Sequence, residues 1–297
     1  MKTIAFAGLG AMGLPMAKNL LAAGHRVRGI DLNPTALAAL AAAGAEPATD
    51  AASAASGAEV LILMVVNAAQ AEQVLFDNGA LQALDTGGIV CLMATCPPAA
   101  VERIGERVLA AGRRFVDAPV SGGTAGATAG TLTIMAACER ATFEDMQPAF
   151  QAVGQRIFQV GERPGQGATV KTVNQLLCGV HIAVVAEAFA LAAKVGVDLE
   201  VLLELMGGSA ASSWMLKDRG PRMLQADPEV SSAVDIFVKD LDIVLEAGRD
   251  AKAALPIAAV AHQLFLATSG RGEGRADDSQ VIRSYYALNG TVPAARS

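Results

Sequence analysis

Runs rich in β-branched residues alternate with Ala- and Leu-rich stretches of helical spacing through roughly the first half of the chain. This alternation predicts a parallel sheet built from strand–helix–strand units. The run from Val60 to Val66 has no polar position, so we expect it at the centre of that sheet. The predicted strands are Thr3 to Gly8, Arg26 to Asp31, Val60 to Val66, Gly88 to Met93, Phe115 to Asp117 and Leu132 to Met135.

The pattern changes near Gly161, after which segments of helical spacing continue to the end of the chain. We therefore expect an α/β domain with a doubly wound parallel sheet over residues 1–162 and an all-α domain over residues 163–297. The stretch from Val170 to Lys194 predicts one long central helix of about seven turns joining the two. Its apolar middle contains His181 and Glu187, which favours a buried helix over a membrane span.

The composition argues against several classes of binding partner and site. The 297-residue chain has a formal net charge of -6 and no dense run of Lys or Arg, which argues against nucleic acid and anionic membranes as partners. Its four cysteines are scattered without a closely spaced pair, so we expect neither a disulfide framework nor a metal site. Reduced thiols indicate a cytoplasmic protein.

A glycine-rich segment with the pattern G-x-G-x-x-G follows the first predicted strand and opens a helix. In this position the pattern is typical of a dinucleotide-binding loop. Gly8 permits the tight turn, Gly10 lets the backbone approach a pyrophosphate, and Gly13 allows helix and strand to pack closely. The helix N-terminus then supplies N–H groups to the phosphates. A turn that merely connects two elements is the alternative. The predicted dinucleotide loop of this Rossmann-type domain is Gly8, Leu9, Gly10, Ala11, Met12 and Gly13.

Asp31 favours the dinucleotide interpretation, because it ends the second strand where a carboxylate can accept hydrogen bonds from the adenosine ribose. Its charge repels a 2′-phosphate, and neither Leu32 nor Asn33 supplies a compensating cation. We therefore expect NAD rather than NADP. A plain turn residue before Asn33 and Pro34 remains the alternative for Asp31.

Four ordered motifs resemble the β-hydroxyacid dehydrogenase family, which includes 3-hydroxyisobutyrate, tartronate-semialdehyde and 6-phosphogluconate enzymes. They are the glycine-rich loop, Asp117 to Gly123 continuing to Leu132, Gly165 to Gln175, and Lys239 to Leu241. Further stretches are similar to the L-threonate dehydrogenase branch, which implies oxidation at C2 of a four-carbon sugar acid. These stretches are Val65 to Gln70, Cys178 to Ala183, Ser213 to Met215 and Ser232 to Lys239.

The resemblance assigns further site residues. It implies that the turn Ser121, Gly122 and Gly123 binds the substrate carboxylate, which the hydroxyl and amides of such a turn are able to do; an ordinary loop is the alternative. It places Val66, Asn67, Thr95 and Lys239 at the cofactor. Capping before Pro97 is a rival interpretation of Thr95, and a solvated helix face is a rival interpretation of Lys239.

Lys171 is the predicted proton-transfer residue. It follows a Gly-x-Gly hinge and lies amid Ala168, Val170 and Val173, where a lysine needs an explanation. Desolvation and a cationic nicotinamide ring would lower its pKa from about 10.4 towards the range of a general base. Asn174 lies on the same helix face and is the predicted partner of the reacting oxygen, with Gln175 as the alternative. His181 is expected to be a core residue.

The predicted function is therefore NAD-dependent oxidation of a small hydroxy acid by a homo-oligomer, either a dimer or a tetramer. Within the family the alternatives are 3-hydroxyisobutyrate oxidation and reduction of tartronate or succinic semialdehyde. A nucleotide sensor without turnover would need no positioned base, so Lys171 argues against it. An imine reductase on this scaffold is expected to replace that lysine.

Overall fold

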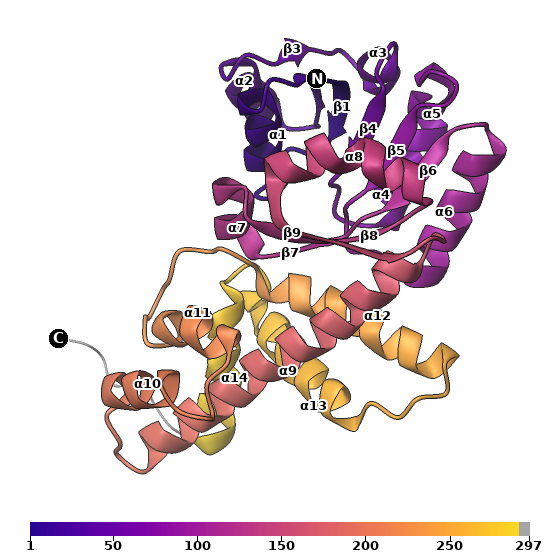
Figure 1. Cartoon of the computed structure of the whole chain (residues 1–297). Helices are drawn as coiled ribbons and strands as arrows, with labels where there is room; N and C mark the ends of the chain where they lie inside the picture. Colours follow the sequence, from indigo (N-terminus) through magenta and orange to yellow (C-terminus); the bar gives the residue numbers. More distant parts are fainter. Residues whose placement is uncertain (291–297) are drawn as a thin grey trace. The chain divides into compact units, whose positions relative to one another are not determined.

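The computed structural model describes residues 1–290, in two compact units of which the second begins at Thr172. The first unit contains a nine-stranded sheet whose order is β3-β2-β1-β4-β5-β6-β8-β7, with β9 paired to β8 (Figure 1). Its strands are β1 (Thr3–Ala7), β2 (Arg26–Ile30), β3 (Glu46–Pro47), β4 (Val60–Leu63), β5 (Ile89–Leu92), β6 (Arg114–Asp117), β7 (Val120–Ser121), β8 (Leu132–Ala137) and β9 (Gly154–Gly161).

The strands from β3 to β6 run parallel, as predicted. The parallel order ends at β8, which pairs antiparallel with both β6 and β7. The short connection through β7 and a seven-residue helix replaces the full crossover that a parallel neighbour requires. The helices of this unit are α1 (Gly13–Ala22), α2 (Pro34–Ala41), α3 (Ala51–Ala55), α4 (Ala68–Glu72), η1 (Gln73–Asp77), α5 (Ala80–Ala83), α6 (Pro98–Ala110), α7 (Gly123–Ala129) and α8 (Arg140–Val153).

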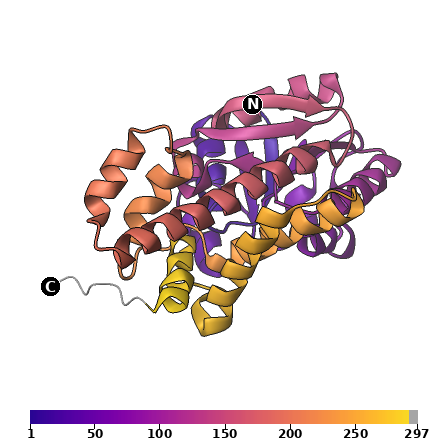
Figure 2. The same cartoon turned by 90° about the horizontal axis from the view of Figure 1, so that it is seen from below.

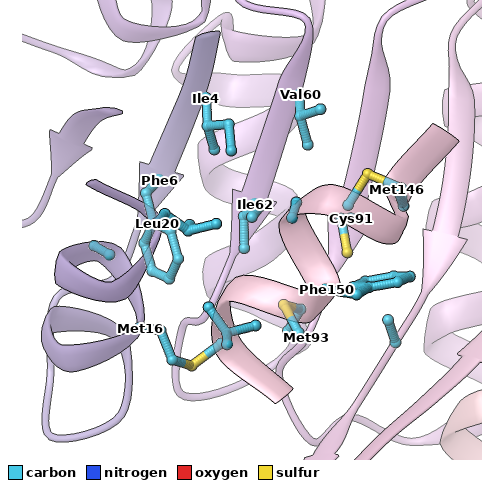
Figure 3. Close-up of a cluster of buried hydrophobic side chains, with 14 of the residues drawn as sticks. Ile4, Phe6, Met16, Leu20, Val60, Ile62, Cys91, Met93, Met146 and Phe150 are labelled. Atoms are coloured by element: carbon cyan, nitrogen blue, oxygen red, sulfur yellow. The ribbon is translucent and has the colours of Figure 1, made fainter. Parts of the chain in front are cut away.

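Strand β4 is central and wholly buried, because successive apolar side chains enter cores on both faces of the sheet. On one face, Ile4 and Cys91 of the strands lie with Met16 of α1 and Phe150 of α8 (Figure 3). The expected strand from Val60 to Val66 is too long, since β4 ends at Leu63 and Val66 is 55% exposed.

Helix α9 (Gln166–Lys194) is unbroken in both views and runs from the end of the first unit into the second (Figures 1 and 2). It begins four residues before the predicted Val170, directly after Gly165, whose φ is +88°. The other helices of the second unit are α10 (Leu199–Gly207), α11 (Trp214–Met223), α12 (Val234–Asp250), α13 (Pro256–Thr268), η2 (Ser269–Glu273), η3 (Asp278–Val281) and α14 (Ile282–Asn289). The α/β domain followed by an all-helical domain is thus confirmed.

One face of α9 enters the core of the second unit through Ile182, Ala186 and Phe189. The helix is long and apolar enough to cross a membrane, and its place in this core identifies it as a core helix. The prediction of a buried His181 is wrong: its side chain is exposed. Ile182, Ala186 and Phe189 follow a helical spacing, and residue 181 lies outside the face that they form.

The predicted domain boundary at residues 162 and 163 stays a prediction. The compact units divide nine residues later, between Lys171 and Thr172, within α9. The last part of the predicted helical domain, residues 291–297, lies outside the described residues.

Candidate active site

The predicted cofactor residues of the first unit lie where parallel strands end. Gly8 follows β1, Asp31 follows β2, Asn67 comes shortly after β4, and Thr95 comes shortly after β5. The carboxyl ends of parallel strands share one edge of the sheet, and the strand order reverses direction between β1 and β4. Ligands of open α/β sheets bind at such a switch point.

The three glycines of the loop meet different surroundings. A Cβ on Gly8, whose φ is +93°, would lie 2.4 Å from the Met64 carbonyl oxygen. A Cβ on Gly13 would lie 1.8 Å from the Gly8 carbonyl oxygen. A Cβ on Gly10 would meet no atom within 4 Å. The fold itself therefore requires glycine at positions 8 and 13, whereas glycine at position 10 leaves room beside the backbone for a ligand.

A hollow of about 610 Å³ opens beside Gly10 and is lined in part by Leu14 and Asn33. Helix α1 begins at Gly13, and the Leu14 N–H donates to the Gly10 carbonyl at 3.1 Å, so the N–H groups next to the loop are those of Ala11, Met12 and Gly13. Asp31 Oδ2 accepts the Leu9 N–H at 2.5 Å, and Asp31 Oδ1 accepts the Asn33 N–H at 2.7 Å. Asp31 is thus both a turn residue and the clamp of the glycine-rich loop. These features fit a dinucleotide: amides for its phosphates and a carboxylate for its ribose.

The loops after the neighbouring strands present apolar side chains and capped helices. Leu32 is fully exposed and Val66 is 55% exposed. Asn67 is the N-cap of α4 and accepts the Gln70 N–H, while Gln70 Oε1 accepts the Val66 N–H. Thr95 is not the N-cap of α6, since Pro97 occupies that position, so the capping interpretation of Thr95 is wrong.

The Ser121–Gly122–Gly123 turn joins β7 to α7. Ser121 pairs with Thr133 of β8, and α7 begins at Gly123. The φ angles of Gly122 and Gly123 are +131° and +61°, and a Cβ on Gly123 would meet no atom within 4 Å. The turn therefore places the Ser121 hydroxyl beside two glycines, with open space at Gly123.

Lys171 lies in the second turn of α9 and is only 7% exposed. The start of its helix is fixed to the sheet by Asp117, whose Oδ2 accepts the Ala168 N–H at 2.9 Å. The side chain of Gln166 folds back so that its Oε1 accepts the N–H groups of Glu162 and Arg163, both at 2.9 Å. Asp117 thus caps the helix N-terminus, and Gln166 holds the loop that leads into the helix.

In the second unit, the predicted residues Asn174 and Lys239 belong to one polar cluster around Asp240, which is 2% exposed. Gln175 Nε2 donates to Asp240 Oδ2, and Lys239 Nζ lies 2.7 Å from Asp240 Oδ1. Asn174 Nδ2 donates to Gln175 Oε1 at 2.8 Å and to Cys178 Sγ at 3.4 Å. Both ends of the Gln175 amide are therefore engaged inside the cluster.

Arg219 and Ser213, which lie in or near the stretches similar to the L-threonate branch, have structural contacts. Arg219 Nε and Nη2 each donate to a carboxylate oxygen of Asp278 at 2.8 Å, and both residues are buried. Ser213 caps α11 by accepting the Leu216 N–H. The guanidinium of Arg219 is accordingly committed to the protein interior.

Two residues of these clusters, Asp117 and Asp240, were not predicted from the sequence. Each had a signal. Asp117 ends β6 directly after the buried Phe115 and Val116, and Asp240 stands in the apolar stripe formed by Phe237, Leu241 and Val244. A carboxylate at such a position needs hydrogen-bond partners, which the structure supplies.

Two family models match the chain. The NAD binding domain of 6-phosphogluconate dehydrogenase matches residues 3–161, and the NAD-binding domain of NADP-dependent 3-hydroxyisobutyrate dehydrogenase matches residues 165–285. Together the two matches span nearly all of the described chain.

Known relatives match over nearly the whole chain. L-threonate dehydrogenase of Cupriavidus necator is 42% identical over 96% of both chains. 2-Hydroxy-3-oxopropionate reductase of Escherichia coli is 35% identical over 95% of this chain and 96% of its own. A crystal structure of 3-hydroxyisobutyrate dehydrogenase from Salmonella typhimurium has a TM-score of 0.89 and 40% identity, covering 94% of this chain and 98% of its own. This chain belongs to the 3-hydroxyisobutyrate dehydrogenase-like family of NAD(P)-dependent β-hydroxyacid dehydrogenases.

Proposed function

We propose that this protein oxidises L-threonate at C2 to its 2-oxo acid with NAD, using Lys171 as the general base. The observation that carries the proposal is the burial of Lys171, which is 7% exposed and lies in a helix start held by the sheet. A lysine is seldom so buried without a role. The 42% identity to an L-threonate dehydrogenase supports the substrate.

In the proposed mechanism, the amides and hydroxyl of the Ser121–Gly123 turn hold the substrate carboxylate. Neutral Lys171 accepts the proton of the reacting hydroxyl, and its protonated form returns that proton in the reverse direction. Bound NAD supplies the acceptor for the hydride that leaves the carbinol carbon. The chain would hold NAD through Gly8, Leu9, Gly10, Ala11, Met12, Gly13, Asp31, Val66, Asn67, Thr95 and Lys239.

Asn174 is the proposed amide partner of the reacting oxygen. Gln175 is buried with both amide ends engaged, to Asp240 and to Asn174. Asn174 is partly exposed and receives its orientation from Gln175. This arrangement supports Asn174 as the residue that contacts the substrate and Gln175 as its support.

The substrate is tested with a panel of acids and NAD. We expect L-threonate to give a kcat/KM about tenfold or more above that of 3-hydroxyisobutyrate, because a site that hydrogen-bonds the extra hydroxyls rejects analogues lacking them. D-threonate, the erythronates and glycerate complete the oxidative panel, and tartronate semialdehyde is tested with NADH. Substantial activity on 3-hydroxyisobutyrate with none on any tetronate would instead favour the activity named for the similar Salmonella structure.

Cofactor choice is predicted from Asp31, whose carboxylate is partly exposed. Two negative charges about 4 Å apart repel by roughly 1 kcal/mol in water and by several at lower dielectric, so we expect kcat/KM to favour NAD over NADP by at least about tenfold. Asp31→Asn removes the charge and should narrow this ratio. Equal use of both cofactors by the wild type would contradict the proposed role of Asp31.

The carboxylate turn is tested by Gly123→Ala. The added methyl group meets no protein atom, so it should raise the KM for the acid about tenfold or more by occupying substrate space while the Kd for NAD stays unchanged. Gly57→Ala is the matched control, since Gly57 has a similar φ of +67° and equally open surroundings away from the turn. A normal KM in Gly123→Ala would place the carboxylate elsewhere.

We also propose that the protein is a cytoplasmic homo-oligomer, either a dimer or a tetramer. Leu177, Val184 and Leu191 lie seven residues apart on α9 and are 50%, 53% and 62% exposed. A repeat of seven places them along one helix face, which suits a second copy of the chain. Cys91 and Cys138 form no disulfide, which supports a reducing compartment. Sedimentation of the purified protein tests the assembly, and a monomer would contradict it.

A further inference from the structure

Asp117 ends strand β6 and is 1% exposed. Its Oδ2 accepts the Ala168 N–H at 2.9 Å, and the backbone N–H groups of Gly165 and Gly167, just before Ala168, also favour the charged carboxylate. A buried carboxylate at a helix N-terminus meets the otherwise unpaired amides and the positive end of the helix dipole. Asp117 therefore caps α9 from a different part of the chain.

The backbone of α9 also approaches the sheet closely at this point. A Cβ on Gly167 would lie 2.6 Å from the carbonyl oxygens of Asp117 and of Met135 in β8. Ala168 is packed in the core on the α6 side of the sheet. The first turn of α9 thus rests directly on two strands, with the carboxylate of Asp117 as its anchor.

Lys171 follows Ala168 by three residues, which is less than one helical turn. Its backbone position is therefore set by the anchored turn. We propose that Asp117 is a positioning residue for the reaction, acting through Lys171 by fixing the first turn of α9 to strand β6. This inference rests on the proposed role of Lys171 as the general base.

The charge on this anchor changes near neutral pH. Burial raises the pKa of Asp117 to about 7, against the lowering effect of the backbone N–H groups of Ala168, Gly165 and Gly167, and Glu102 of α6 raises it further. The thiols of Cys91 and Cys138 also interact with Asp117, and burial raises the pKa of each above its ordinary value. Ionisation of Asp117 strengthens its hydrogen bonds to the α9 amides, since charged acceptors bind more strongly.

A double-mutant cycle tests the proposal. Asp117→Asn keeps the shape and loses the charge, and we expect kcat to fall about tenfold in an otherwise wild-type chain, with an unchanged Kd for NAD. In the Lys171→Ala background the same change should cost less than about twofold, because the residue through which it acts is gone. Equal losses in both backgrounds would overturn the proposal. Full activity of Lys171→Ala alone would instead overturn the proposed function.

The pH profile supplies a readout that a purely structural role would not move. Wild-type kcat should show an ionisation near pH 7 that is absent in Asp117→Asn. Asp145→Asn is the control, since Asp145 is a surface carboxylate of the same unit, paired with Lys2 and Arg114. The same ionisation in Asp117→Asn as in the wild type would contradict the proposal.

A measurement on the wild type covers the case in which Asp117→Asn does not fold. We expect the amide NMR signals of Gly165, Gly167 and Ala168 to titrate near pH 7 with the same midpoint as the backbone amide signal of Lys171. Independent behaviour of the Lys171 amide would overturn the coupling.

Discussion

Replacing Lys171 with alanine is expected to lower kcat by at least about 100-fold, the usual loss when a general base is removed. The Kd for NAD should stay nearly unchanged, because Lys171 lies outside the glycine-rich loop. Stopped-flow turnover and fluorescence titration with NAD measure the two quantities separately. The expected split is a loss in kcat without a loss in cofactor binding.

Lys194→Ala is the matched control for this experiment. Lys194 ends the same helix, and its Nζ donates to the Asn289 carbonyl in the second unit. Its removal should leave kcat within about twofold of the wild type, as expected for a surface substitution away from the site. Wild-type rates in Lys171→Ala would refute the assignment of the base.

Two substitutions in the glycine-rich loop should affect different properties: Gly13→Ala should lower stability, and Gly10→Ala should lower the affinity for NAD. Gly13→Ala forces a methyl group to within 1.8 Å of the Gly8 carbonyl oxygen. Backbone must move to relieve this overlap, so we expect a loss of about 3 kcal/mol or more in the free energy of unfolding. That corresponds to a fall of roughly 6 °C or more in Tm for a chain of this size.

Gly10→Ala should instead leave Tm unchanged, because its methyl group meets no protein atom within 4 Å. The same methyl group would occupy the approach of the pyrophosphate, so we expect the Kd for NAD to rise about tenfold or more. Thermal unfolding and NAD titration of both variants separate the two glycines. Normal NAD affinity in Gly10→Ala would place the pyrophosphate away from this loop.

The sequence predicted those strands whose own residues are mostly apolar. The strands from β1 to β6 that carry full apolar runs were found, because a strand buried on both faces has a distinctive composition. Strands β3 and β7 have two residues each, and β9 is partly exposed and contains polar residues. Pairing with neighbouring strands makes these three segments β-structure, and that is a tertiary effect.

The direction of β8 and the exposure of His181 were not predictable for a related reason. A strand's side-chain pattern is the same whether its neighbour is parallel or antiparallel. Apolar residues lie on every side of α9, so its sequence does not distinguish the face that enters the core from the face that contains residue 181.

Some residues of the candidate site could also be predicted from the sequence, and others could not. Glycine spacing located the loop at Gly8 to Gly13, since the fold requires glycine at positions 8 and 13 and leaves open space at position 10. Asp117 and Asp240 depend on partners that are distant in sequence: Ala168 is 51 residues from Asp117, and Gln175 is 65 residues from Asp240. The sequence shows that a buried carboxylate needs hydrogen-bond partners, but it does not show which residues these partners are.

The clamp on the glycine-rich loop has a consequence for the thermodynamics of cofactor binding. The Leu9 N–H is held by Asp31, the Gly8 N–H by the Ile30 carbonyl, and Gly13 packs against the Gly8 carbonyl. Fixing a flexible residue costs roughly 1–2 kcal/mol of conformational entropy. A loop already ordered by the fold does not incur that cost when a ligand arrives, so association with the dinucleotide should proceed without a separate loop-ordering step.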